Sequence, residues 1–140
     1  MGRILAIDYG RKRSGIAVTD TLQIVANGLT TVASHELEAF LTRYTSQEKV
    51  DKIIIGLPKQ MNNEYSESMK YIEPFVNRLR KVMPDMPVEM YDERFTSVLA
   101  HRAMLDGGMK KMARRDKAIV DEISATIILN DYLQSLQSRL

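Results

Sequence analysis

Three consecutive isoleucines, Ile53 to Ile55, followed by Gly56, most strongly constrain how this chain can fold. A strand that is apolar at every position, rather than at alternate positions, has to be covered on both of its faces. Strands of this kind are typical of sheets that carry helices on either side. The run therefore predicts an α/β fold with a doubly covered strand at residues 53–56.

Apolar segments elsewhere in the chain predict four further strands. Residues 4–8 and 15–19 are short and rich in Ile, Val, Leu and Ala, and glycines bracket the charged gap between them, which is typical of a hairpin. Residues 24–32 contain several β-branched side chains and predict a third strand. Residues 88–91 predict the last strand. Since tight turns join the first three strands, we expect an antiparallel meander there.

Apolar residues at steps of three and four predict the helices between and after the later strands. Ser34 is expected to cap the first helix. A stripe over residues 65–83 predicts a second helix that is kinked at Pro74 or restarts there, because proline interrupts a helix interior. A short helix ending near Gly107 and a last helix over residues 116–137 complete the chain.

The order of these elements and the length of 140 residues predict a single domain over residues 1–140. The order is β-β-β-α-β-α-β-α-α. It predicts a mixed five-stranded sheet, a three-strand antiparallel meander plus parallel strands, with helices on both faces. No apolar run is long enough to cross a membrane, and we expect no signal peptide. The absence of cysteine excludes disulfides and thiolate chemistry and fits a cytoplasmic protein.

Acidic residues lie at the ends of three predicted elements. Asp8 ends the first strand, and Asp92 and Glu93 end the fifth. Asp121 and Glu122 lie in the first turns of the last helix, with Asp121 at the edge of its apolar face. Carboxylates gathered from distant segments need a cation, and an all-oxygen ligand set favours Mg²⁺ or Mn²⁺, which serve in phosphodiester hydrolysis. Acids are also common at strand ends and helix starts, so the spacing alone leaves both interpretations open.

Two basic segments, residues 11–13 and 110–117, stand out against a net charge of only +2. Each is either a phosphate-binding segment or a solvated turn, and the local charge alone does not separate the two. The aromatic content is 6%, with no Trp, which gives little support for stacking on single-stranded bases. If the chain binds nucleic acid, we therefore expect recognition of backbone and shape.

Four segments in order resemble the YqgF family of Holliday-junction-resolvase-like proteins. They are "AIDYGRKRSGIAVTD" (6–20), "IIIGLP" (53–58), "DERFTS" (92–97) and "DEISATIIL" (121–129). The resemblance covers nearly the whole chain and implies a ribonuclease H-like fold. Members of the family are described as nucleases that process the 5′ end of pre-16S rRNA. The resemblance therefore implies a cytoplasmic phosphodiester hydrolase that acts in ribosome biogenesis.

Matched position by position, the resemblance implies the residues of the site. Asp8, Glu93 and Asp121 would be catalytic and would bind one or two Mg²⁺ or Mn²⁺ ions, with Asp8 as the bridging ligand. Arg94 and Thr96 would support this site or contact phosphate. The side chains expected to meet the nucleic acid are Arg11, Lys12, Arg13, Arg94, Thr96, Lys110, Lys111, Arg114 and Arg115.

Three other functions compete with rRNA processing. The first is resolution of Holliday junctions or other branched DNA, and the second is a non-catalytic nucleic-acid-binding module on the same fold. The third is an ATP-binding protein of the actin, sugar-kinase and Hsp70 type, which shares the Asp-x-Gly hairpin but needs two such domains, more than 140 residues hold. We expect a nucleic-acid partner, an rRNA precursor or structured DNA, and no membrane. The chain is expected to be a monomer or a weak homodimer.

Overall fold

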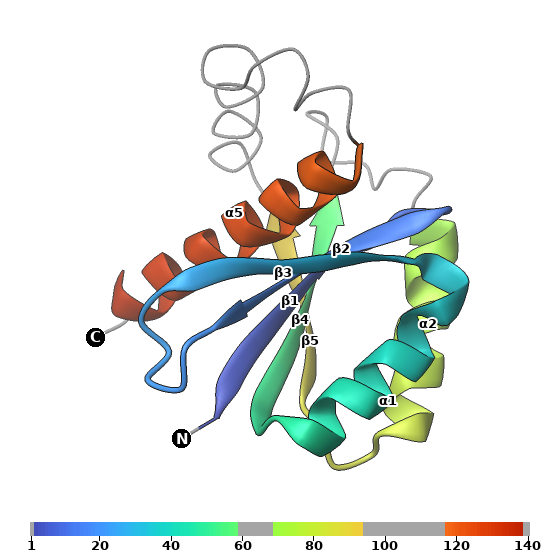
Figure 1. The fold of residues 1–140 in the computed structure, drawn as a ribbon, viewed down its shortest axis with the longest axis horizontal. Helices are drawn as coiled ribbons and strands as arrows, with labels where there is room; N and C mark the ends of the chain where they lie inside the picture. The colour runs from blue at the N-terminus through green and yellow to red at the C-terminus, as the bar shows by residue number, and fades with distance from the viewer. Residues whose placement is uncertain (1, 59–68, 94–116, 139–140) are drawn as a thin grey trace.

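The computed structural model describes residues 2–58, 69–93 and 117–138. Within these ranges the chain forms a five-stranded sheet in the order β3-β2-β1-β4-β5, with helices on both sides (Figure 1). The strands are β1 (Arg3–Asp8), β2 (Arg13–Thr19), β3 (Ala26–Ala33), β4 (Val50–Pro58) and β5 (Val88–Glu93). The helices are α1 (Leu37–Gln47), α2 (Met69–Val82) and α5 (Lys117–Ser138), and a short 3₁₀ helix, η1 (Ser34–Glu36), precedes α1.

The strand directions confirm the predicted mixed sheet. β1 pairs antiparallel with β2, and β2 pairs antiparallel with β3, which forms the meander. β4 pairs parallel with both β1 and β5. Strands β1, β3, β4 and β5 therefore point the same way and end at one edge of the sheet, which we call the carboxyl edge. Open α/β sheets form their clefts at such an edge.

The three isoleucines of β4 show how both faces of the sheet are covered. Ile53 and Ile55 pack in the layer formed with α1 and α2, whereas Ile54 packs in the layer formed with α5. All three side chains are fully buried. Figure 1 shows α1 and α2 together on one side of the sheet and α5 on the other. The doubly covered strand predicted from the sequence is thereby confirmed.

The layer under α5 combines large apolar side chains with several small residues. Its sheet side carries three buried alanines: Ala6, Ala17 and Ala26. Ser124 and Ala125 of α5 are buried as well. A Cβ added to Gly28 of β3 would lie 3.4 Å from Thr126 Oγ1 and 3.6 Å from Glu122 Cβ, so the helix passes very close to this strand. Small side chains on both partners allow this close approach.

Ser34 does not cap the first helix, so this prediction was wrong. Ser34 belongs to η1, and α1 has no side-chain cap hydrogen bond. The Ser34 hydroxyl instead donates to the Gly10 carbonyl and shares a hydrogen bond with Ser14 Oγ at 2.9 Å. The Ser34 amide also donates to the Lys12 carbonyl. Long-range bonds to the β1–β2 hairpin have replaced the local cap.

Strand β3 begins at Ala26, two residues later than predicted. Ile24 and Val25 are 61% and 53% exposed and precede the strand. The Asp20 carboxylate accepts hydrogen bonds from both of their amides, at 2.8 and 2.9 Å. The same bonds lower the pKa of Asp20, because they favour its charged form. Capture of these amides by Asp20 keeps the two residues out of the strand ladder.

Helices α2 and α5 follow the predicted periodicity. Ile72, Val76 and Leu79 of α2 are fully buried, and the helix continues through Pro74 without restarting. Pro74 lacks the amide that would have bonded to the carbonyl of Lys70, and Lys70 is exposed to solvent. In the described ranges, no helix combines the length and apolar character needed to cross a membrane. The short helix predicted before Gly107 lies outside the described residues.

Candidate functional site at the carboxyl edge of the sheet

Asp8 is the last residue of β1 and stands at the carboxyl edge. It pairs with Gly15 of β2 and is half-buried. Because strand residues alternate between faces, Asp8 shares a face with Ile4 and Ala6, both of which pack in the α5 layer. The carboxylate therefore lies at the end of the strand, on the face of the sheet that α5 covers.

Glu93 is the last residue of β5 and reaches the same edge. Ile7, Ile55 and Met90 are aligned across β1, β4 and β5, so Asp8 and Glu93 both lie beyond this line, with β4 between them. Neighbouring strands are roughly 4.8 Å apart, which puts β1 and β5 about 10 Å apart. Only the backbone position of Glu93 is described, and its side chain lies outside the described set.

Asp121 lies in the N-terminal part of α5, one helical turn before the fully buried Ala125. The next residue, Glu122, lies over Gly28 of β3. Gly28 of β3 pairs with Ala17 of β2, and Ala17 pairs with Ala6 of β1. Glu122 therefore crosses the sheet at the level of Ala6, two residues before Asp8. In Figure 1 the N-terminal end of α5 also lies toward the side to which the arrows of β4 and β5 point. The side chain of Asp121 lies outside the described set.

The structure thus places the backbone positions of the three predicted acids at or near the carboxyl edge, and their ligand role stays a prediction. Among the side chains that are described, no group of three His, Cys, Asp or Glu is arranged to hold a metal ion. Glu93 and Asp121 are not among those side chains.

The β1–β2 hairpin presents the predicted basic residues at the same edge. Arg11 and Lys12 are exposed at its tip, and Arg13 is half-buried as the first residue of β2. A Cβ added to Gly10 would overlap the Arg13 carbonyl oxygen, so this tight turn requires glycine. Six other residues predicted to contact nucleic acid lie outside the described ranges: Arg94, Thr96, Lys110, Lys111, Arg114 and Arg115.

Hydrogen bonds tie the C-terminal half of α5 to β4 and β5. The Tyr132 hydroxyl accepts a bond from Lys52 Nζ at 2.7 Å and donates to Glu89 Oε2 at 3.2 Å. The Tyr91 hydroxyl donates to Asp131 Oδ2 at 2.9 Å. The bond to Tyr132, followed by that to Glu89, raises the pKa of Lys52. These polar contacts fix the position of α5 across the sheet.

An aromatic groove of about 440 Å³ lies on the other face, beside the hairpin. The Tyr9 and Phe75 rings stack with their centroids 4.9 Å apart and an interplanar angle of 29°. Arg11 Cζ lies 4.7 Å from the centroid of the Tyr71 ring. The residues that line the groove include Tyr9, His35, Glu38, Tyr71, Phe75 and Arg78.

Sequence reasoning missed this groove, because its aromatic residues come from distant segments. The available signal was the four-residue spacing of Tyr71 and Phe75, which places both on one face of α2. The position of Tyr9, directly after Asp8, was the second signal.

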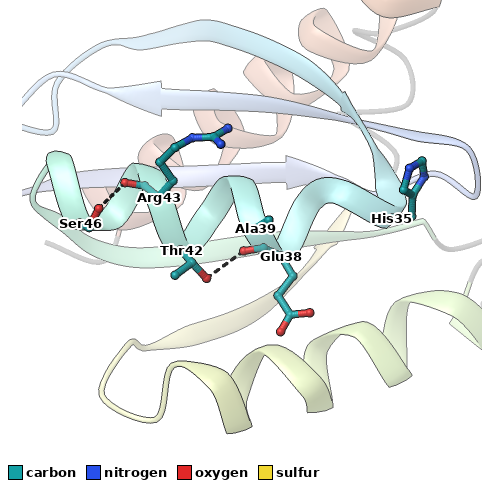
Figure 2. A pocket seen from close by; sticks show the side chains of 6 residues that line it. All are labelled: His35, Glu38, Ala39, Thr42, Arg43 and Ser46. Carbon is teal, nitrogen blue, oxygen red and sulfur yellow. Dashed lines mark hydrogen bonds between the residues drawn. The ribbon is translucent and has the colours of Figure 1, made fainter.

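A second hollow, of about 520 Å³, follows the outer side of α1 (Figure 2). Its polar groups bond within the helix: Thr42 Oγ1 donates to the Glu38 carbonyl and Ser46 Oγ donates to the Arg43 carbonyl. Figure 2 shows the Glu38 side chain directed toward α2, where it meets Arg78 at 2.7 Å, with His35 at the far end of the hollow. We assign no chemistry to this hollow, because its polar groups do not converge.

Comparison with known proteins places this geometry in context. The family model described as "RuvX: Holliday junction resolvase" matches residues 2–135. A Bacteroides fragilis protein named "Putative pre-16S rRNA nuclease" is 70% identical over 135 residues, which cover 96% of this chain and 98% of the relative. A Parabacteroides distasonis protein with the same name is 61% identical over 140 residues and the full length of both chains.

Two solved structures from Thermus thermophilus share the fold. RuvC in complex with a Holliday junction substrate matches with a TM-score of 0.54 and 17% identity, over 91% of this chain and 92% of RuvC. A second RuvC structure matches with a TM-score of 0.52 and 14% identity, over 90% and 92% of the two chains. At these identities the likeness concerns the fold, and it confirms the predicted ribonuclease H-like architecture.

Proposed function

This chain belongs to the RuvX (YqgF) family of resolvase-like nucleases, and from this premise we propose that it hydrolyses phosphodiester bonds in precursors of 16S rRNA. The observation that carries the proposal is the family match along the chain, together with Asp8 at the carboxyl edge beneath α5. The printed name of the Bacteroides relatives supports the choice of substrate. We propose that the chain acts in the cytoplasm, where this RNA is processed, as a monomer or a weak homodimer.

The proposed metal ligands are Asp8, Glu93 and Asp121. Their donors are all carboxylate oxygens, which suits Mg²⁺ or Mn²⁺. Asp8 also fits by position, because it is half-buried at the strand end, on the face toward α5. One or two such ions, when bound, supply a Lewis acid that activates water and stabilises the leaving oxygen. The chain's own contribution is to hold these carboxylates on two strands and a helix that pack closely.

The proposed binding surface for the nucleic-acid backbone begins at Arg11 and Lys12. Both are exposed at the hairpin tip, within four residues of Asp8 in the sequence. Positive side chains at this place attract phosphate and release counterions, which supports a phosphodiester bond being brought to the carboxyl edge. Arg13, Arg94, Thr96, Lys110, Lys111, Arg114 and Arg115 complete the proposed set.

Cleavage of branched DNA is the second candidate, because the family description names Holliday junction resolvase. A single assay separates the candidates: incubation with a structured 5′ pre-16S rRNA fragment, a single strand and a four-way DNA junction, with Mg²⁺, Mn²⁺ or EDTA. We expect metal-dependent cleavage of the rRNA fragment, lost in Asp8→Asn, which keeps the side-chain shape and removes its charge. Equal cleavage by a pure Asp8→Asn preparation would contradict the site. Binding without cleavage by the wild type would indicate a non-catalytic module.

A further inference from the structure

We propose that the aromatic groove beside Asp8 binds one unpaired nucleobase, so that this protein engages a single-stranded segment of its nucleic acid. The inference rests on the proposed function and specifies the form of the substrate at the same edge of the sheet. It also revises the expectation, drawn from composition, that recognition involves only backbone and shape.

The groove lies next to the proposed catalytic edge. Tyr9 directly follows Asp8 in the sequence. Its side chain packs toward the α1/α2 core, whereas Asp8 lies on the α5 face. Consecutive Cα atoms are about 3.8 Å apart, so the two side chains start from the same point of the carboxyl edge and extend to opposite faces of the sheet. A nucleic-acid strand with its phosphate at Asp8 reaches the groove by passing around this edge. A base on that strand can enter the groove while its backbone follows the carboxyl edge.

The walls of the groove offer aromatic faces. Tyr71 is 39% exposed, which leaves its ring accessible to a ligand. Phe75 is half-buried and is held in place by stacking on Tyr9. Bases stack on such rings with little regard to sequence, since every base has a π-face. The volume of about 440 Å³ is within the range of pockets that take a small ligand, which fits a single base better than a base pair.

The charges around the groove favour a polyanion. Glu38 lines it, and an unpaired carboxylate there would repel phosphate. Arg78 Nε lies 2.7 Å from Glu38 Oε2 and neutralises it, while the Arg78 side chain is 70% exposed. Arg11 covers one side of Tyr71 and adds a second arginine. Glu38, Arg78 and Arg11 together give the rim of the groove a net positive charge. A positive rim attracts the phosphate that is attached to a base.

The test compares binding of a single-stranded RNA of about twelve nucleotides, which is within the range of site sizes known for single-strand-binding domains, with binding of a blunt duplex of the same sequence. The full chain is titrated in EDTA, so that no cleavage interferes. Tyr71→Ala should weaken single-strand binding about tenfold, the size expected for one lost stacking contact, and leave duplex binding within about twofold. Tyr71→Phe should bind like the wild type, because it keeps the ring. Val82→Ala is the matched control, since Val82 is 43% exposed at the other end of α2.

Arg11→Gln distinguishes stacking from charge. If Tyr71 only holds Arg11 in place, Tyr71→Ala and Arg11→Gln should lose equal affinity for single strand and duplex, and the base site is overturned. Phe75→Leu, which keeps an apolar side chain in the partly buried position, is the second variant and should also lose single-strand affinity selectively. Melting temperatures show whether each variant is folded. Unchanged single-strand affinity in folded Tyr71→Ala and Phe75→Leu overturns the proposal.

A parallel cleavage assay with Mg²⁺ keeps this proposal separate from the proposed function. If the wild type does not cleave, and Tyr71→Ala selectively loses single-strand binding, the base site is supported and the nuclease function is contradicted. Normal cleavage, with no selective loss of binding, contradicts the base site alone. A wild type that binds neither RNA contradicts both.

Discussion

The two helical layers of this protein bury apolar surface in different ways. Among the described residues, twelve form the buried cluster under α1 and α2, and all of them are Leu, Ile or Val. The cluster under α5 takes four of its ten residues from alanine, and polar bonds from Tyr132 add to it. The α1/α2 layer therefore supplies most of the aliphatic burial, whereas the α5 layer supplies close and directed packing.

This difference suggests a division of roles between the layers. A large aliphatic side chain contributes in proportion to its buried area, and the layer that holds many of them determines overall stability. The four alanines of the α5 layer contribute less area, but they set the distance between α5 and the sheet. Because Asp121 is on α5 and Asp8 is on the sheet, that distance matters for the proposed site. Substitutions in the two layers should therefore have different consequences.

The largest effect on stability is expected in the α1/α2 layer. Ile72→Ala should lower the free energy of unfolding by about 2–5 kcal/mol, because Ile72 is fully buried and a cavity is left behind. Cleavage per folded molecule should stay close to that of the wild type. Denaturant unfolding measures the first effect and the assay described above measures the second. Val82→Ala on the same helix is the control and should change stability little, since Val82 is 43% exposed.

A smaller loss of stability, with a larger loss of activity, is expected in the α5 layer. Ala125→Leu should cost about 1–3 kcal/mol, because the added atoms have no room between α5 and the sheet. A shift of the helix by about 1 Å should lower cleavage on the order of 10²-fold. Ala39→Leu, at an exposed alanine of α1, is the matched control. Equal activity losses in Ile72→Ala and Ala125→Leu would remove the functional distinction between the layers.

The third prediction concerns the three acids of the proposed metal site. Without divalent metal, Asp8→Asn, Glu93→Gln or Asp121→Asn should leave stability unchanged or raise it by on the order of 1 kcal/mol, because like charges are relieved. Millimolar Mn²⁺ should raise the melting temperature of the wild type and raise that of each variant much less. If the acids are instead caps and turn formers, each variant loses about 1 kcal/mol and Mn²⁺ has little effect on any of them.

The smallest effect is expected at the hairpin outside both layers. Arg11→Gln with Lys12→Gln should leave the melting temperature within a few degrees, because both side chains are exposed at the hairpin tip. Binding of duplex RNA should weaken, and the slope of log affinity against log salt should fall by roughly one for each lost phosphate contact. Lys49→Gln with Lys81→Gln, at two exposed residues outside the hairpin, serves as the charge-matched control. An unchanged salt slope would show that the hairpin is a solvated turn.

Most of the fold could be predicted from local sequence patterns. Ile53 to Ile55 predicted a doubly covered strand, and each of them is buried in the layer that strand alternation requires. The wrong predictions concern places where a side chain forms a hydrogen bond that a pattern of neighbouring residues does not predict. Asp20 holds two amides that propensity placed in a strand, and Ser34 bonds to the β1–β2 hairpin rather than to its own helix. Such competition depends on contacts that periodicity does not encode.

The candidate site was less predictable from sequence. Asp8 could be placed at a strand end from its position after an apolar run, and the structure puts it there. The assignment of Glu93 rather than Asp92 came from the family resemblance, because spacing alone allowed either. The aromatic groove depends on Tyr9 directly after β1 and on Phe75 and Tyr71 of α2, which only the packing of the sheet against α2 brings together. Composition therefore underestimated the aromatic surface available at this edge.

The packing of α5 on β1, β2 and β3 has a consequence for synthesis of the protein on the ribosome. These three strands emerge first, and the helix that covers one of their faces lies more than eighty residues after the last of them, at Lys117–Ser138. A nascent chain exposes these strands before α5 has been synthesised, so the alanine face of the sheet lacks its helix until that segment has left the exit tunnel. In the proposed site, Asp8 and Asp121 therefore come together only when synthesis of the chain is almost complete.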